Sequence, residues 1–192
     1  MRAHGWLLWA WGRAHRLVAA AALAAVVFVV TTQKTDIAFA SGVLAVPVPV
    51  AVIGVVVSVL VIVVPMGRVF AELDATFYRR YLDRGLTVTC SLLLANIAVW
   101  PATWSIRTGF SRPLFLLLCA LAILWVVLTG PIAWAPALTT GLLLLVLDLR
   151  SPALPVTSRL ENLGEVTLLA VLLGSIATYI RLGPGGAANG SA

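Results

Sequence analysis

Residues 43–66 read VLAVPVPVAVIGVVVSVLVIVVPM, and this stretch indicates the fold class more clearly than any other part of the chain. Ser58 is the only polar side chain in it. A helix that crosses a lipid bilayer needs about 20 consecutive, predominantly apolar residues. The stretch therefore predicts a membrane-spanning helix.

The composition of the whole chain agrees with that prediction. The 192 residues are 61% hydrophobic and 10% charged, and the mean hydropathy is +1.07. Soluble domains carry about 25% charged residues, and a chain of this length cannot bury so much apolar surface in a water-soluble core. We therefore expect a multi-pass protein of the plasma (inner) membrane.

Further apolar runs lie on both sides of residues 43–66. They cover Leu17–Val30, Leu86–Trp104, Leu114–Thr129, Ile132–Leu147 and Val166–Ile180. Together the runs predict an all-α, polytopic membrane helix bundle with about six transmembrane helices, and five or seven are the alternatives. We assign residues 17–181 to one transmembrane domain. The Gly- and Ala-rich residues 182–192 are expected to form a disordered tail.

The runs Leu114–Thr129 and Ile132–Leu147 almost touch, and GPIAWAP (130–136) lies at their junction. One helix over residues 114–147 would be about 51 Å long, far beyond a hydrocarbon core of about 30 Å. Gly130–Pro131 is a helix-stop signal, and Pro136 suits the first turn of a new helix. The junction predicts a tight hairpin of two helices.

The N-terminal arm, residues 1–16, carries Trp6, Trp9 and Trp11 close to Arg13 and Arg16. Tryptophan is enriched at the headgroup level of membranes, and arginine interacts with lipid phosphates. The arm is therefore expected to lie in the membrane interface. The alternative is that the first membrane helix begins early and tilts.

The distribution of Lys and Arg predicts the orientation. With the N-terminus inside, eight basic residues lie on the cytoplasmic side: Arg2, Arg13, Arg16, Arg68, Arg79, Arg80, Arg84 and Arg181. Five lie outside: Lys34, Arg107, Arg112, Arg150 and Arg159. Because basic residues are in excess in cytoplasmic loops, this arrangement predicts that the N-terminus and the C-terminus are both cytoplasmic.

One segment carries seven of the twenty charged side chains: GRVFAELDATFYRRYLDRG (67–85). Its apolar residues recur at three- and four-residue steps between the helix breakers Pro65 and Gly85, which predicts an amphipathic helix at the inner membrane surface. The segment is either a topology anchor, the bent inner end of a membrane helix, or a docking surface for a cytoplasmic partner. The candidate docking residues are Arg68, Glu72, Asp74, Arg79, Arg80, Asp83 and Arg84.

The predicted spans contain few reactive groups. Asn96 is the one strongly polar residue deep in a span, and it is a candidate for helix packing or for contact with a substrate. Cys90 and Cys119 lie in apolar runs and suit inert thiols. No catalytic motif, metal-ligand cluster or phosphate-binding loop is present in the sequence, so we expect no enzyme activity and no cofactor.

Three pieces of sequence carry a resemblance to a known family: AVPVPVAV (45–52), ELDATFYRRYLDRG (72–85) and GPIAWAP (130–136). In this order, over residues 43–148, they resemble small actinobacterial integral membrane subunits of ABC exporters associated with natural-product (lanthipeptide and antibiotic) gene clusters. The resemblance implies the permease half of an exporter for an amphipathic or peptide-like substrate, with a role in antibiotic resistance.

An exporter of this kind implies several partners. A P-loop ATPase subunit on a separate chain would supply energy, and a second copy of the chain or a related membrane subunit would complete the translocation path. Nucleic acid is not expected as a partner, because no basic stripe with interleaved aromatic residues is present. The alternative hypotheses are a non-transporting accessory subunit of a larger membrane complex and a narrow pore.

Overall fold

The computed structural model describes residues 16–33, 36–41, 44–66, 77–104, 112–150 and 164–184. These residues form six α-helices, a short 3-10 turn and one two-stranded hairpin. The helices are α2 (Leu17–Thr32), α3 (Val50–Met66), α4 (Phe77–Trp104), α5 (Arg112–Thr129), α6 (Trp134–Arg150) and α8 (Glu165–Leu182). The predominantly helical character confirms the predicted class.

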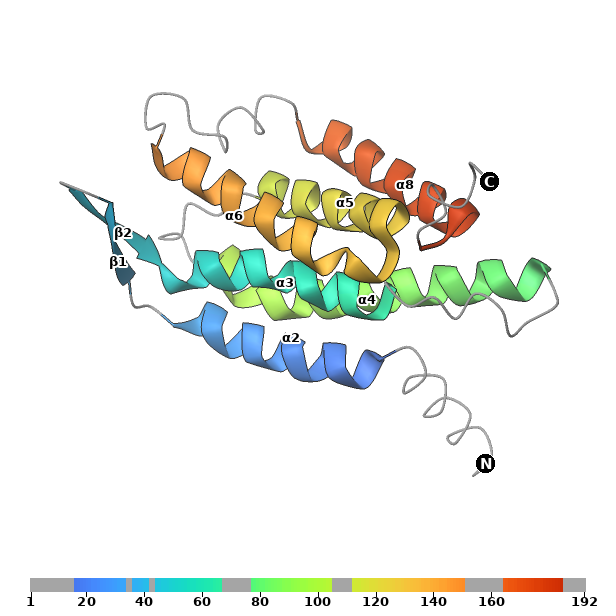
Figure 1. Cartoon of the computed structure of the whole chain (residues 1–192). Helices are drawn as coiled ribbons and strands as arrows, with labels where there is room; N and C mark the ends of the chain where they lie inside the picture. Colours follow the sequence, from blue (N-terminus) through green and yellow to red (C-terminus); the bar gives the residue numbers. More distant parts are fainter. Residues whose placement is uncertain are drawn as a thin grey trace.

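The six helices lie side by side, and each runs opposite in direction to the helix before it (Figure 1). The start of α2, the α5–α6 connection and the end of α8 therefore lie at one end of the bundle. The strand hairpin and the start of α8 lie at the other end. A chain that crosses a lipid bilayer several times needs helices that alternate in direction in this way.

Three of the described helices are long and apolar enough to cross a membrane: Tyr81–Ala102, Arg112–Ile132 and Glu165–Leu182. Three further helices are equally apolar in character but shorter: Leu17–Thr32, Val50–Met66 and Trp134–Leu147. These lengths are compatible with a membrane protein. The number of spans and their orientation stay predictions.

Helix α3 is the centre of the bundle, and it contacts α2, α4, α5 and α6. Its buried residues, among them Ala51, Val55, Val59, Ile62 and Met66, cover most of the helix surface. The face with Ile53, Val57, Leu60 and Val64 is half-buried. A helix that is apolar all round is typical of a position surrounded by other elements. The run that identified the fold class in the sequence is thus the innermost helix.

Two glycines let neighbouring helices approach α3 closely. A Cβ atom at Gly54 of α3 would lie 2.8 Å from Cγ2 of Thr31 on α2. A Cβ atom at Gly141 of α6 would lie 2.8 Å from Cγ1 of Val56 on α3. Small residues at such contacts allow the close helix packing on which membrane bundles depend.

The connection between α5 and α6 confirms the predicted tight hairpin. Helix α5 ends at Thr129, the 3-10 turn η2 covers Gly130–Ile132, and α6 begins at Trp134. Gly130 has a φ of 59°, a left-handed conformation that glycine adopts without steric cost. Pro136 lies in the first turn of α6. N–H groups in the first turn have no partner within the helix, so a proline there costs no hydrogen bond.

The second predicted helix begins later than expected. Residues 44–49 are not helical but form strand β2 (Leu44–Pro49), which pairs antiparallel with β1 (Asp36–Ser41). Pro47 and Pro49 explain the difference, because a residue before proline is restricted to extended backbone and proline is tolerated at the edge of a sheet. Helix α3 starts directly afterwards, at Val50.

The third predicted helix begins earlier than expected. Helix α4 runs without interruption from Phe77 to Trp104, so Gly85 lies inside it and is not its N-terminal boundary. The 28 residues of α4 make it about 42 Å long. Its first turns extend beyond the ends of α2 and α3 (Figure 1).

Candidate functional site

The predicted docking residues divide into three groups. Arg68, Glu72 and Asp74 lie outside the described residues. Arg79 and Arg80 lie on the first turns of α4, where the structure describes the backbone.

Two members of the predicted set have described side chains, and both are half-buried: Asp83 and Arg84. They lie on α4 just after the turns that carry Arg79 and Arg80. The part of the candidate site that can be built atom by atom is therefore the one around Arg84.

Arg84 reaches across to the C-terminal end of α8. Its Nη1 donates hydrogen bonds to the backbone oxygens of Ile180 (2.8 Å) and Arg181 (3.1 Å). Both oxygens belong to the last turn of α8, where carbonyl groups have no partner within the helix. A cation at this position also interacts favourably with the negative end of the helix dipole.

The backbone just after α8 leaves room for the guanidinium group. Gly183 has a φ of 78°, and a Cβ atom at this position would overlap the Arg84 side chain. The Gly183 N–H group donates to the oxygen of Tyr179 at 2.7 Å, which closes the helix end. Glycine is the residue that tolerates both the positive φ and the close approach.

A second side chain caps a second helix at the same end of the bundle. The buried hydroxyl group of Tyr179 on α8 donates to the backbone oxygen of Met66 at 3.3 Å. Met66 is the last residue of α3, so its oxygen also lacks a partner within its own helix. We call Met66, Arg84, Tyr179, Ile180 and Arg181 the capped end.

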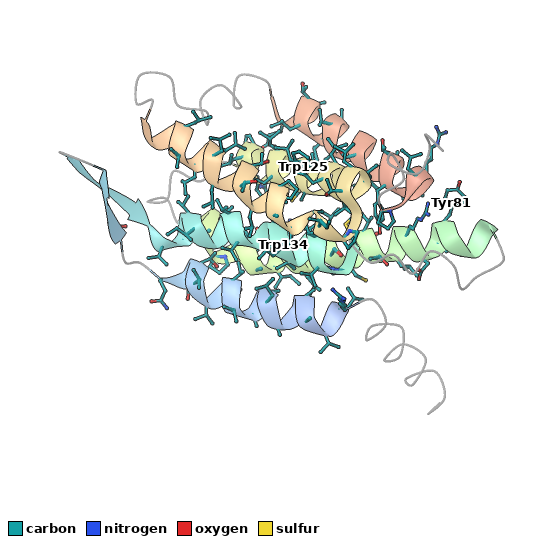
Figure 2. All side chains as sticks on the ribbon, viewed as in Figure 1. Tyr81, Trp125 and Trp134 are labelled. Atoms are coloured by element: carbon teal, nitrogen blue, oxygen red, sulfur yellow. The ribbon has the colours of Figure 1, made fainter. Side chains whose placement is uncertain are left out.

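The capped end connects three helices in series. Helix α4 holds the end of α8 through Arg84, and α8 holds the end of α3 through Tyr179. Figure 2 shows Tyr81 on the part of α4 that extends past α2 and α3, on the side of the last turns of α8. A force applied to the first turns of α4 would therefore reach the end of α8 through Arg84, in addition to the direct packing of α4 against α3.

Most hydroxyl groups of the bundle bond their own helix. Ser58, Ser91 and Ser175 donate to a backbone oxygen three or four residues earlier, at 2.6–2.9 Å. Such bonds satisfy the hydroxyl hydrogen without any partner outside the helix.

Away from the capped end, polar contacts in the described part of the chain also join different helices. Thr31 Oγ1 on α2 lies 2.9 Å from the oxygen of Ala98 on α4, and it shares its hydrogen with the oxygen of Phe28. Trp125 Nε1 on α5 donates to Thr140 Oγ1 on α6 at 3.2 Å. These bonds fix α2 against α4 and close the α5–α6 hairpin in register.

Asn96 lies on the outward face of α4, where its side chain is exposed. No hydrogen bond joins its carboxamide to another residue in the part of the chain that the structure describes. Among the described residues it therefore takes no part in helix packing through hydrogen bonds. Sequence periodicity could not place this residue, because the neighbouring residues of α4 are apolar on every side.

No group of three or more potential metal ligands occurs among the described histidine, cysteine, aspartate and glutamate residues. Both cysteines are free; Cys119 is buried and Cys90 is half-buried.

The chain was compared with protein-family models, with curated proteins and with solved structures, and none of the three comparisons finds a match.

Proposed function

We propose that this chain is the membrane (permease) subunit of an ABC-type exporter whose energy comes from a P-loop ATPase on a separate chain. In this proposal six helices cross the plasma membrane, and the capped end faces the cytoplasm. The substrate is amphipathic or peptide-like, as lanthipeptide antibiotics are. The proposal starts from an apolar bundle with three helices suited to crossing a membrane.

The observation that carries the proposal is the unbroken course of α4. Its length of about 42 Å exceeds the hydrocarbon core of about 30 Å, so its first turns extend out of the lipid. Those turns contain Arg79 and Arg80. A cytoplasmic subunit bound to them would hold the exposed end of a rigid rod whose other part is embedded in the bundle.

The contacts of Arg84 connect α4 to the end of α8, so a movement of α4 can be transmitted into the bundle. Because Arg84 holds the last carbonyl groups of α8, a tilt of α4 also displaces the end of α8. Tyr179 passes the displacement to the end of α3, which is the central helix. The part of the docking segment on α4 is thus connected to the core by one series of two contacts, from Arg84 to α8 and from Tyr179 to α3.

The test begins with gentle purification of the protein from its native membrane and identification of the chains that copurify. We expect a P-loop ATPase among them. The double substitution Arg79→Glu and Arg80→Glu is expected to remove the ATPase from the purified complex, because it reverses the sign of two charges at the proposed contact. The protein itself should remain folded, as judged by its helical circular dichroism.

Arg112→Glu is the matched control, since Arg112 is an exposed arginine at the opposite end of the bundle. It should leave the ATPase bound. Retention of the ATPase by the Arg79→Glu/Arg80→Glu protein would contradict the docking role of α4. Recovery of the chain without any ATPase would contradict the exporter proposal as a whole.

The alternative proposal is a non-transporting accessory subunit of a larger membrane complex. The exposed apolar surface of α8 favours it, because Val166, Leu169, Val171 and Leu173 all face outward. Such a surface suits contact with another membrane protein as well as with lipid. Copurification with other membrane subunits and no ATPase would support this alternative.

A further inference from the structure

The outward face of α4 carries a regular stripe of six exposed residues. They are Leu82, Leu86, Thr89, Leu93, Asn96 and Trp100. Their successive spacings are four, three, four, three and four residues, which is the seven-residue repeat that two helices need to pack along a common seam. The stripe is also well exposed, since Leu93 is 58% and Trp100 54% accessible.

Asn96 makes this stripe a poor surface for lipid. Measured along the span Tyr81–Ala102, it lies about 9 Å inside the nearer end. A carboxamide that faces hydrocarbon leaves two N–H donors and one carbonyl without partners, and each missing bond has a substantial free-energy cost. The neighbouring Thr89 has no such need, because it donates to the oxygen of Gly85 on its own helix.

We propose that the stripe is the contact surface between two copies of this chain, with Asn96 of each copy hydrogen-bonded to Asn96 of the other. Two copies inserted in the same direction are related by a two-fold axis along the membrane normal. In such a dimer equivalent residues meet at the same depth. A carboxamide is complementary to itself, since it offers both a donor and an acceptor.

The charge of the stripe also suits a second copy. A two-fold contact places each residue of the seam near its own equivalent, so any charge would meet a like charge. None of the six residues is charged. A different partner would need a polar group placed by chance at the depth of Asn96, whereas a second copy supplies that group by symmetry.

This inference depends on the membrane placement in the proposed function but not on transport or on an ATPase. The first test uses single-cysteine proteins in which Cys90 and Cys119 are replaced by alanine. Leu93→Cys places a thiol on the stripe, and Leu173→Cys places one on α8, where Leu173 is 63% accessible. On oxidation in native membranes, Leu93→Cys is expected to give a disulfide-linked homodimer and Leu173→Cys is not.

Equal cross-linking of the two variants would overturn the proposal, because it would show contact by random collision. Cross-linking of Leu93→Cys to a different protein alone would also overturn it. The transport proposal is judged separately by copurification with the ATPase, so either proposal can fail while the other stands.

The second test measures the dimer dissociation constant by energy transfer between labelled copies in liposomes. Asn96→Leu is expected to raise the constant about three- to thirtyfold, which corresponds to one interhelical polar contact. Thr139→Val is the control, because Thr139 is an exposed hydroxyl on α6 that bonds its own helix. An unchanged or lower constant for Asn96→Leu would mean that simple apolar contact drives association, and would overturn the Asn96 pairing.

Discussion

Arg84 belongs to the most charged segment of the chain, yet its guanidinium group points to the end of α8 rather than away from the protein. Sequence periodicity assigned it to a polar helix face and, with that, to a cytoplasmic partner. The structure gives it a second use, because the last carbonyl groups of α8 have no helical partners. That use depends on which helix end lies beside residue 84, and periodicity contains no such information.

Replacement of Arg84 measures the strength of this cap. Arg84→Ala is expected to lower the free energy of unfolding by about 1–2 kcal/mol, since two carbonyl groups lose a charged donor at a partly exposed site. Arg84→Lys should lose less, because it keeps the charge but not the planar fork. The measurement is unfolding of the detergent-solubilised protein followed by circular dichroism. Arg112→Ala serves as the control, and an equal loss there would contradict the cap.

The contact of Gly54 with α2 gives a second prediction for a single residue. Gly54→Ala is expected to lower the free energy of unfolding by about 1–3 kcal/mol, because the new methyl group would push α2 away from α3. Gly174 on α8 is the matched control, since a Cβ atom there would meet nothing within 4 Å. The same substitution at Gly174 should be neutral or stabilising by up to about 1 kcal/mol. Similar effects at both glycines would argue against close packing at Gly54.

Among the helices, α4 shows the most important difference from the sequence-based prediction, because it begins before Gly85 and continues through it. Glycine near the start of an apolar run commonly marks a helix boundary, and Gly85 was expected to mark one. In the structure the helical hydrogen bonding continues through it, and the oxygen of Gly85 accepts the hydroxyl group of Thr89. Tertiary contacts at the start of α4, Arg84 among them, outweigh the intrinsic cost of glycine in a helix.

Two substitutions at Gly85 test whether α4 is continuous. Gly85→Ala is expected to raise the free energy of unfolding by about 1 kcal/mol, since a Cβ atom meets nothing within 4 Å in a helix interior. Gly85→Pro should lower it by about 3 kcal/mol, because proline removes a hydrogen bond and clashes with the preceding turn. Both are measured by the unfolding assay used for Arg84. If Gly85 were a helix end, alanine there would instead be neutral or destabilising.

Most helix positions could be predicted from the sequence, because a run of apolar residues long enough to cross a bilayer has few alternatives to a helix. Helix α2 and helix α8 begin and end within two residues of the predicted runs. The strand before α3 was missed for a physical reason. Valine and alanine are compatible with both structures, and the effect of Pro47 and Pro49 on backbone shape was outweighed by hydropathy in the prediction.

The candidate site could be predicted only in part. The charged segment was identified from its composition, and Arg84 was among the residues proposed for it. The contribution of Tyr179 was missed, since a lone tyrosine in an apolar run gives no sign of which carbonyl its hydroxyl will meet. The outward position of Asn96 was also beyond sequence reasoning, because burial in a bundle depends on helix rotation and not on hydropathy.

For the molecule as a whole, the alternating helices make a simple prediction about its two ends. Single cysteines at Arg16 and Arg181 lie at the capped end, and single cysteines at Gln33, Arg112 and Glu165 lie at the end with the strand hairpin, which we call the hairpin end (Figure 1). In a cysteine-free background, an impermeant maleimide added to intact cells is expected to label the hairpin-end set. The capped-end set should react only after the membrane is permeabilised, as the excess of basic residues inside predicts.

The labelling pattern distinguishes an error in the predicted orientation from an error in the predicted number of membrane crossings. Labelling of the capped-end set in intact cells, with protection of the hairpin-end set, would reverse the orientation but keep six crossings. Mixed labelling within one set would contradict a bundle in which every helix crosses the membrane. Treatment of permeabilised cells controls for reactivity, because all five positions are exposed in the structure.

The two caps at the end of the bundle have a consequence for biosynthesis. Chains are made from the N-terminus, and α8 is the last of the described helices to emerge. It brings both the hydroxyl group that meets Met66 and the carbonyl groups that meet Arg84. We therefore expect the first five helices to wait in the membrane as an unfinished assembly, open to chaperones and proteases. Packing of α8 would then complete the fold and protect the newly made chain from degradation.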